Sequence, residues 1–371
     1  MSERNTGRKG ACFVTPEFSG NTGGSIGDRD IFRRISEWQG KKGTQLMDYA
    51  YFGEEYASVK KDFLRWNLVF RKNAGEMMNC DYLFINCTIS RLFRIFPWRR
   101  RKKTNCVTVG IIYHPDYLSR TGLKKRIERR MLRAFLKNMD YVITPDPFAL
   151  DWLKSEGFSD RSVLAEMDLS REVHRHEGPG EKIVCFVGTV EPRKGLEYGI
   201  RAFAGFLKHH PGYQFQIAGA FREGLSDPAY CDELEALISE LGAEEKIRFL
   251  GRVDEEEKES LYGRSDIFLF PSQLEGYGWV MIEAMSYGLP VVAFDNSAIP
   301  YTVKADNGFV VPNRDVDAMT DALDRLAEDE TLYRHLSEGA VRTVEKLPGP
   351  AEVDAEWEDF FRMLEHEKAG C

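Results

Sequence analysis

The chain has 371 residues, of which 43% are hydrophobic and 30% charged, so it is neither disordered nor fibrous and is long enough for two globular domains. The formal charge of −8 argues against nucleic acid as a partner, but it hides an asymmetry. Residues 1–180 hold 32 of the 51 Lys and Arg and 22 of the 59 Asp and Glu, a net charge of +10. The remaining 19 and 37 give residues 181–371 a charge of −18, so we expect the halves to have different partners.

Export, membrane and metal signals are missing from the sequence. No apolar run reaches the roughly 18 residues of a membrane span, and the opening MSERNTGRKGACFV lacks the apolar core of a signal peptide. The seven cysteines are scattered without a C-x-x-C pair, and no histidine has an acidic or cysteine partner at metal-ligand spacing. The sequence therefore predicts a cytoplasmic chain with reduced thiols and with no metal or cofactor.

In the first half, short apolar runs typical of strands alternate with longer amphipathic stretches. We predict strands over residues 10–15, 45–52, 81–87, 105–112 and 140–144. Helices are predicted over 122–138 and 146–156. The sequence Gly178-Pro-Gly180 can continue neither a helix nor a strand, so it predicts a linker.

The second half alternates more regularly. Strands are predicted over 182–187, 213–218, 246–250, 266–270, 290–294 and 308–311. Helices are predicted over 195–209, 229–241, 254–263, 279–287, 315–328 and 351–367. Such alternation indicates parallel sheets covered by helices, so we expect two Rossmann-like α/β domains facing a central cleft.

The predicted strand 266–270 runs into a loop and helix that read Glu275-Gly-Tyr-Gly278-Trp-Val-Met-Ile-Glu283. Ligands of open α/β sheets bind at the carboxyl ends of strands, and glycines before a helix let its N–H groups approach an anion. Carboxylates beside such a phosphate site suit the hydroxyl groups of a sugar. The alternative is a solvated loop acid and a surface helix acid, although the apolar neighbours of Glu283 predict partial burial.

The loop after 182–187 reads Gly188-Thr189-Val-Glu191-Pro-Arg193-Lys194. It again joins a strand to a helix through glycine, here with two adjacent cations whose fork and point charge suit a diphosphate. Fixed cations stabilise the negative charge that builds on a departing diphosphate during glycosyl transfer. The alternative is a surface Arg-Lys pair that Glu191 neutralises.

These loops resemble those of retaining glycosyltransferase family 4, also called glycosyl transferases group 1, over residues 183–345. The run E-G-Y-G-x4-E-A-M-x-x-G-L-P-V-V is similar to the E-x7-E signature of that family, and G-T-x-E-P-R-K-G is similar to its phosphate loop. The resemblance implies the GT-B fold and a metal-independent reaction. It also implies an acceptor-binding domain over 1–177, a donor-binding domain over 181–350, and a C-terminal helix, 351–371, that packs back on the first domain.

Roles for single residues follow from the same resemblance. Glu275 contacts the donor sugar, Glu283 the nucleotide ribose, and Lys194 the diphosphate. Thr189 stands where many members have Arg, so Arg193 is assigned to supply the guanidinium. The implied donor-binding set is Gly23, Gly24, Gly188, Thr189, Arg193, Lys194, Glu275, Gly276, Tyr277, Gly278, Trp279, Val280 and Glu283.

The first half resembles the family more loosely. Gly23-Gly24 is similar to its Gly-Gly loop, and His114 to a histidine that touches the donor sugar, so His114 joins Glu275, Lys194 and Arg193 as a catalytic candidate. The alternatives are a plain glycine turn and a histidine at a strand end without a role. The triplets Asp28-Arg-Asp30 and Asp315-Val-Asp317 precede apparent helices, where Asp is a common cap or first-turn residue, so we predict these roles rather than metal ligands.

The positive charge of the first half is concentrated in two stretches. Residues 91–103 read RLFRIFPWRRRKK, and helix 122–138 has seven cations beside apolar residues. Such clusters suit an anionic membrane surface, and the alternative is that the apolar residues are core and the cations solvated.

Together with the resemblance, these features predict retaining transfer of a hexose-type sugar from a nucleotide diphosphate sugar. The expected acceptor is a lipid-linked or polysaccharide-precursor glycan, with the protein lying peripherally at the inner face of the membrane. Alternatives are an inactive sugar-nucleotide-binding or membrane scaffold, and a GT-B epimerase.

Overall fold

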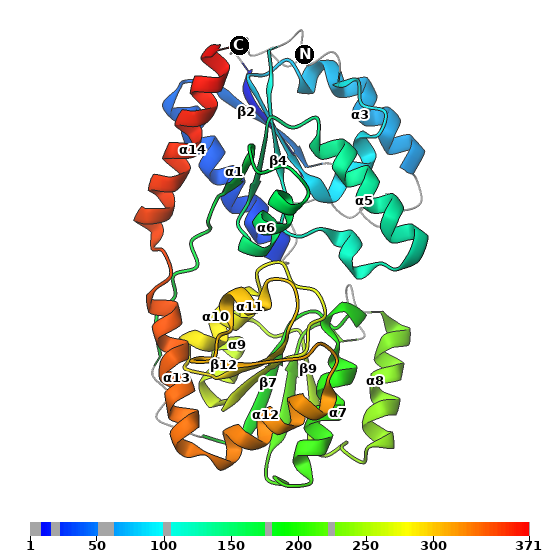
Figure 1. The fold of residues 1–371 in the computed structure, drawn as a ribbon, viewed down its shortest axis with the longest axis vertical. Helices are drawn as coiled ribbons and strands as arrows, with labels where there is room; N and C mark the ends of the chain where they lie inside the picture. The colour runs from blue at the N-terminus through cyan, green and yellow to red at the C-terminus, as the bar shows by residue number, and fades with distance from the viewer. Residues whose placement is uncertain are drawn as a thin grey trace. The chain divides into compact units, whose positions relative to one another are not determined.

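Figure 1 shows the computed structural model, which describes residues 9–15, 23–50, 63–98, 105–174, 180–221 and 227–370. Contacts divide the chain into two compact units. Unit 1 comprises residues 1–168 and 350–371, and unit 2 comprises residues 169–349.

The division falls before the predicted linker at Gly178-Pro-Gly180, of which residues 178 and 179 lie outside the described residues. The reason is that the preceding segment already packs on unit 2. The backbone N–H of His174 donates to the carbonyl of Ser286 at 2.7 Å, and its ring stacks on that of Tyr287 with centroids 4.3 Å apart.

Unit 1 contains a six-stranded parallel sheet in the order β2-β1-β3-β4-β5-β6. Its strands are β1 (Lys9–Thr15), β2 (Gln45–Ala50), β3 (Tyr82–Asn86), β4 (Val107–Ile111), β5 (Tyr141–Thr144) and β6 (Ser162–Leu164). The first five agree with the predicted strands to within a few residues. We did not predict β6, because it has only three residues, all half-buried, and so lacks an apolar run.

The helices of unit 1 are α1 (Gly23–Lys41), α3 (Phe63–Met77), α5 (Gly122–Leu136), α6 (Pro147–Ser155) and α14 (Pro350–Gly370), with 3-10 turns η2 (Cys87–Phe93) and η4 (Asp116–Ser119). We predicted α5, α6 and α14, and a helix of unstated length after Asp30, but not the start of α1 or helix α3. The glycines in the first turns of α1 give this segment a low helix propensity. The later residues Ile31, Ile35 and Trp38 nevertheless recur at helical spacing and are buried.

The C-terminal helix α14 packs within unit 1. Trp357 and Phe361 enter the core, and the ring of Phe361 stacks on Trp38 with centroids 4.4 Å apart. Trp357 Nε1 donates to the carbonyl of Glu166 at 2.9 Å, which satisfies its buried polar group.

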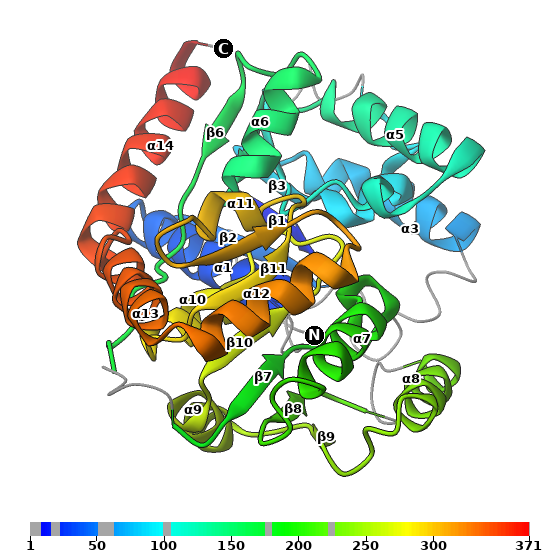
Figure 2. The same cartoon turned by 60° about the horizontal axis from the view of Figure 1, so that its bottom comes forward.

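Unit 2 contains a second six-stranded parallel sheet, in the order β12-β11-β10-β7-β8-β9. Its strands are β7 (Ile183–Val187), β8 (Gln214–Ala218), β9 (Ile247–Gly251), β10 (Ile267–Phe270), β11 (Val291–Phe294) and β12 (Gly308–Val311), and all six agree with the predicted strands to within one residue. Figure 2 shows the strands of this sheet beside their helices.

The helices of unit 2 are α7 (Leu196–Leu207), α8 (Pro228–Glu240), α9 (Glu255–Arg264), α10 (Trp279–Ser286), α11 (Ile299–Thr302), α12 (Val316–Glu328) and α13 (Glu330–Glu345), with the 3-10 turn η5 (Pro192–Lys194). We did not predict α11 or α13. Helix α13 was not predicted because no glycine or proline separates it from α12. Asp329 alone ends α12 and caps α13.

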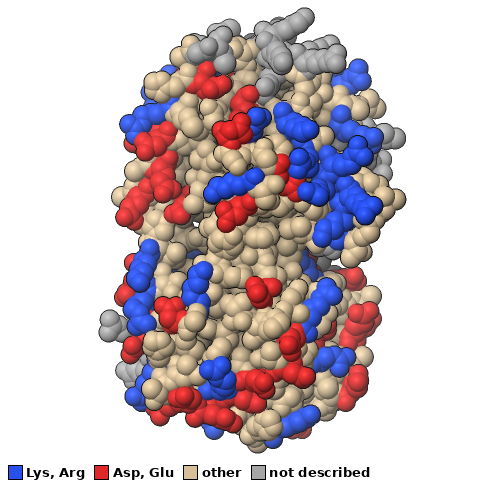
Figure 3. All heavy atoms as spheres, in the orientation of Figure 1, with Lys and Arg blue, Asp and Glu red and all other residues tan. Residues whose placement is uncertain are grey.

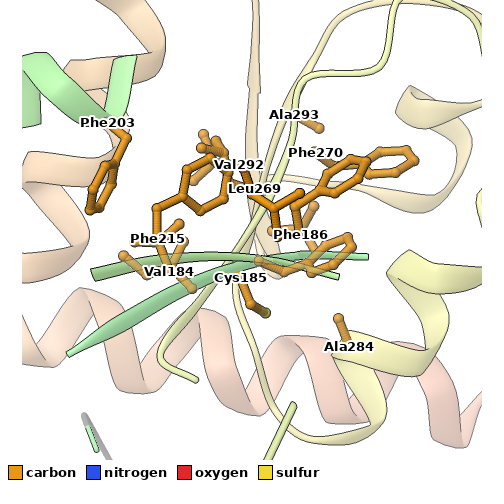
Figure 4. Close-up of a cluster of buried hydrophobic side chains, with 14 of the residues drawn as sticks. Val184, Cys185, Phe186, Phe203, Phe215, Leu269, Phe270, Ala284, Val292 and Ala293 are labelled. Carbon is orange, nitrogen blue, oxygen red and sulfur yellow. The ribbon is translucent and has the colours of Figure 1, made fainter. Parts of the chain in front are cut away.

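The core of unit 2 explains why its strands are readable from sequence. Strands β7, β10 and β11 are buried at every position, so each is a continuous apolar run, as in parallel sheets covered on both faces. Figure 4 shows Phe186 and Phe270 side by side and Phe203 close to Phe215. The last two rings have centroids 5.3 Å apart.

Candidate active site

The strand order of unit 2 locates its ligand crevice. From β7 the sheet grows through β8 to β9 on one side, and through β10 and β11 to β12 on the other. Because the strand order reverses between β7 and β10, the carboxyl ends of these two strands form the switch point at which such sheets bind ligands, here called the crevice. The loops after β7 and β10 carry Lys194 and Glu275, which are 81 positions apart in the sequence.

Lys194 and Glu275 form a nearly buried ion pair in this crevice. Lys194 Nζ lies 2.6 Å from Glu275 Oε2, and the two side chains are 9% and 12% exposed. Ser272 donates its hydroxyl to the same oxygen at 3.2 Å, and Nζ lies 5.1 Å from the centroid of the Phe270 ring. A cation and a carboxylate from two different loops are therefore held together at one point.

Arg193 joins the two loops instead of projecting from the first. Its guanidinium lies 2.7 Å from Glu191 Oε1 and donates to the carbonyl of Leu274 at 2.6 Å. It is 3.7 Å from Glu275 Oε2. The sequence left open whether Glu191 neutralises the Arg-Lys pair. Glu191 does pair with Arg193, whereas Lys194 pairs with Glu275 in the loop after β10.

A glycine allows the two loops to approach this closely. Gly195 has φ of 62°, and a Cβ there would lie 2.3 Å from the carbonyl oxygen of Pro271. The backbone N–H of Gln273 donates to the carbonyl of Arg193 at 2.9 Å. Any side chain at position 195 would therefore push Lys194 away from Glu275.

A third loop, after β11, fixes the backbone of Glu275. The N–H of Glu275 donates to Ser297 Oγ at 2.8 Å, and Ser297 donates in turn to Asn296 Oδ1 at 2.9 Å. Asn296 Nδ2 donates to the carbonyl of Ser272 at 2.7 Å. Our sequence analysis missed these three residues. The available signal for Asn296 and Ser297 was their position directly after the predicted strand 290–294, at the same edge of the sheet.

Glu283 is partly buried on α10, as its apolar neighbours predicted. Its Oε2 lies 3.0 Å from Lys258 Nζ and 3.2 Å from the hydroxyl of Tyr262, and both partners are on α9. Burial opposes the charge of Lys258, but hydrogen bonds and the charges of Glu255 and Glu283 raise the pKa of Lys258 overall. Lys258 and Tyr262 were missed, because nothing in the sequence brings α9 to α10.

The remaining donor-site candidates of unit 2 lie in the same loops. Gly278 is the N-cap of α10 and Trp279 its first residue. Gly276 and Gly278 are buried, while Tyr277, Trp279 and Val280 are half-buried. Gly188 and Thr189 follow β7, and Gly188 donates its N–H to the carbonyl of Ala218 at 2.9 Å.

The candidates of unit 1 lie at the carboxyl edge of its own sheet. Gly23 and Gly24 begin α1, and the half-buried His114 follows β4. The predicted cap at Asp28 is wrong, because Asp28 lies inside α1 and is buried. The predicted cap at Asp315 is correct, since its side chain accepts the N–H of Ala318 at the start of α12.

The described residues show neither a metal-binding cluster nor a membrane-spanning helix. Within them, no cluster of three or more His, Cys, Asp or Glu side chains is suited to holding a metal ion. None of their helices combines the length and apolar character that crossing a membrane requires.

The structure corrects one part of the predicted basic face. Phe93 and Phe96 are buried, and Trp98 packs on the same core cluster, so these aromatic residues do not face a membrane. Residues 99–104 lie outside the described residues. On α5, the side chain of Leu132 in the C-terminal half is buried. Leu123 and Ile127, in the N-terminal half, are 72% and 48% exposed. Figure 3 shows Lys and Arg gathered where Figure 1 places α5.

Known proteins are similar in sequence to this chain over unit 2. Residues 170–343 match the family model described as glycosyl transferases group 1. A D-inositol 3-phosphate glycosyltransferase of Nocardia farcinica is 34% identical over 167 residues, which cover 44% of this chain and 36% of the relative. An alpha-D-kanosaminyltransferase of Streptomyces kanamyceticus is 31% identical over 192 residues, covering 52% and 47%. The matched region thus spans less than half of either relative.

Solved structures extend the similarity to both units. A sucrose-phosphate synthase of Thermosynechococcus elongatus has a TM-score of 0.76 at 18% identity and covers 96% of this chain and 99% of its own. HepE of Anabaena, in complex with UDP and glucose, has a TM-score of 0.72 at 14% identity, covering 96% and 100%. At these identities the likeness establishes the fold, which is the predicted pair of Rossmann-like α/β domains of the GT-B type.

Proposed function

We propose that this chain is a glycosyltransferase of the group 1 type that transfers a hexose-type sugar from a nucleotide diphosphate sugar. The observation that carries the proposal is the Lys194–Glu275 ion pair, which lies in the crevice of unit 2 and inside the matched region 170–343. The proposed reaction retains the anomeric configuration and needs no metal ion.

The chemistry of the crevice supports a division of roles. The diphosphate is proposed to bind the ammonium of Lys194 and the N–H groups at the start of α10, where the helix dipole favours an anion. Glu275, released from Lys194 by the diphosphate, then accepts hydrogen bonds from sugar hydroxyls. Glu283 is proposed to hold the ribose hydroxyls through Oε1, which has no hydrogen bond among the described residues, since Lys258 and Tyr262 occupy Oε2.

A ligand panel tests the donor site. The melting temperature of the full chain is measured with UDP-, GDP- and ADP-sugars, where saturation at about 100 times Kd stabilises by about 2.7 kcal/mol. Lys194→Met should abolish the shift, and Lys208→Met, an exposed lysine at the end of α7, should keep it. UDP-glucose is the first probe, because HepE was solved with UDP and glucose. If no nucleotide sugar shifts the melting temperature, the donor site is wrong.

The reaction itself is tested by product analysis. Hydrolysis or transfer of the donor identified in the panel should be lost in Lys194→Met, and product formation should persist in EDTA. Proton NMR of the first-formed product should give the anomeric configuration of the donor. Donor binding without turnover would favour the scaffold alternative, an inverted product would contradict retention, and inhibition by EDTA would contradict the metal-independent reaction.

The proposed acceptor is a lipid-linked or polysaccharide-precursor glycan that the protein meets as a peripheral protein at the inner face of a membrane. The exposed Leu123 and Ile127 support this, because they lie on α5 among Lys124, Lys125 and Arg126, and each cation near an anionic surface contributes about 1 kcal/mol. The chain should float with vesicles containing anionic lipid at low salt. Leu123→Ser with Ile127→Ser should reduce flotation, and Leu250→Ser on unit 2 should not. Equal flotation of all three proteins would contradict this surface.

A further inference from the structure

Unit 1 has a switch point of its own. From β1 its sheet extends to β2 on one side and through β3 and β4 to β6 on the other. The strand order therefore reverses between β1 and β3, and the carboxyl ends of these neighbouring strands form the place where such sheets bind ligands. Thr15 ends β1 and Asn86 ends β3, so both lie at this point.

A buried carboxylate gathers the side chains of this switch point. Asp28, on α1, is 2% exposed and accepts hydrogen bonds from three different segments. Asn86 Nδ2 lies 2.7 Å from its Oδ2 and 3.0 Å from its Oδ1, and the Tyr113 hydroxyl donates to Oδ1 at 2.7 Å. Thr15 Oγ1 donates to Oδ2. Every partner is a neutral donor, which is the arrangement an ionised carboxylate requires.

The same cluster fixes two candidates of the proposed site. Tyr113 immediately precedes His114, and Asp28 lies little more than one turn after Gly23-Gly24. Gly27 brings α1 against Tyr113, since a Cβ at position 27 would lie 2.7 Å from the Tyr113 hydroxyl. Asp28 therefore ties the start of α1 to the segment that carries His114.

We propose that Asp28 is a positioning residue that, in its ionised form, holds the start of α1 and the Tyr113-His114 segment in place at the switch point of unit 1. The proposal rests on the glycosyltransferase function proposed above. A protonated Asp28 carries one O–H donor, which faces three donors where only acceptors are useful. The hydroxyl of Thr15 or of Tyr113 must then turn from donor to acceptor, and the hydrogen bonds that tie α1 to Tyr113 lose the charge that strengthens them.

Burial makes this change occur at an accessible pH. Desolvation raises the pKa of Asp28, and the hydrogen bonds from Thr15, Tyr113 and Asn86 lower it. Desolvation is the larger effect, so the pKa lies at about 6. These three neutral groups come from β1, from the segment after β4 and from β3, and Tyr113 is the titratable one. Burial raises the pKa of Tyr113 far above that range, with a further contribution from the charges of Asp28 and Asp30, so Tyr113 itself stays protonated.

The first test is a pH profile of donor turnover, with UDP-glucose as the probe. With a pKa of about 6, only about a tenth of Asp28 is ionised at pH 5, so kcat/KM should fall about tenfold between pH 8 and pH 5. Asp28→Asn should remove this fall, and Tyr113→Phe should move its midpoint to higher pH because one stabilising hydrogen bond is lost. Asp30→Asn is the matched control, since Asp30 lies on the same helix but pairs with Arg33 and Arg34. An unchanged fall in Asp28→Asn overturns the proposal.

A second test needs no catalysis. Hydrogen exchange of the full chain should lose protection in the first turns of α1 and around His114 when Asp28 is replaced by Asn at pH 7.5. The wild-type chain should keep this protection at pH 5, after correction for intrinsic exchange, because protonation relieves the burial of the charge, and Asp30→Asn should keep it at pH 7.5. Lost protection in a chain that binds no nucleotide sugar would refute the proposed function but not the structural role of Asp28. Unchanged protection in Asp28→Asn would overturn the role of Asp28 whatever the activity.

Discussion

Replacing Lys194 by Met should separate what the Lys194–Glu275 pair does for stability from what it does for function. Met keeps an apolar stem that can pack near Phe270 but leaves Glu275, which is 12% exposed, without its cation. Breaking a buried pair by removing one partner typically costs about 3–5 kcal/mol. Glu275 keeps the hydroxyl of Ser272 at 3.2 Å and Arg193 at 3.7 Å, so we expect the lower end, about 3 kcal/mol.

The assay is urea unfolding of the ligand-free chain, with hydrogen exchange of β7 and β10 to assign the loss to unit 2. Lys194→Met combined with Glu275→Gln removes both charges and should recover most of the lost free energy of unfolding. Neither variant should bind the donor. If Lys194→Met unfolds within about 0.5 kcal/mol of the wild type, the pair is solvated and the reasoning from its burial is refuted.

Three further predictions concern other parts of the molecule. Because the pKa of Asp28 is raised from 3.8 to about 6, the folded state binds a proton that the unfolded state has released, so stability falls as pH rises from 4 to 6. The free energy of unfolding of Asp28→Asn relative to wild type should therefore increase by about 2.4 kcal/mol between pH 4 and pH 7, and a constant difference would contradict the buried charge. Lys258→Met should raise the Kd for UDP about tenfold, because Glu283 loses the cation that orients it. The variant should also prefer UDP over 2′-deoxy-UDP less strongly than the wild type does, as measured by calorimetry. An unchanged preference would mean that Glu283 does not bind the ribose. Trp357→Ala should cost about 3–5 kcal/mol in the unfolding of unit 1, and a loss under 1 kcal/mol would mean that α14 docks only loosely.

The charge asymmetry of the sequence gains a physical meaning in unit 2. Residues 181–371 carry −18, but residues 350–371, with seven Asp or Glu and two Lys or Arg, belong to unit 1. Unit 2 therefore carries −13, yet the proposed ligand is a diphosphate. Lys194 and Lys258 each neutralise a carboxylate of the crevice, Glu275 and Glu283 respectively, at 2.6 and 3.0 Å. Local pairing therefore offsets the repulsion that the net charge would impose on an anionic ligand.

The sequence by itself determined the parallel α/β architecture and the two loops of the candidate site in unit 2. Strands such as β7 and β10 are buried on both faces, so they are continuous apolar runs, and the polar and glycine residues that follow them mark the loops. Helix α13 was not predicted because no glycine or proline marks its start, and strand β6 was not predicted because it lacks an apolar run.

Only the tertiary structure decided which residues meet. Lys194 and Glu275 are 81 positions apart, and Asp28 and Tyr113 are 85 apart, so their contacts depend on the order of strands in each sheet. The buried state of Asp28, the pairing of Lys258 with Glu283 and the position of Ser297 under Glu275 follow from that order. A local pattern carries the period of a strand or helix, but long-range pairing is set by packing, and no short stretch of sequence encodes it.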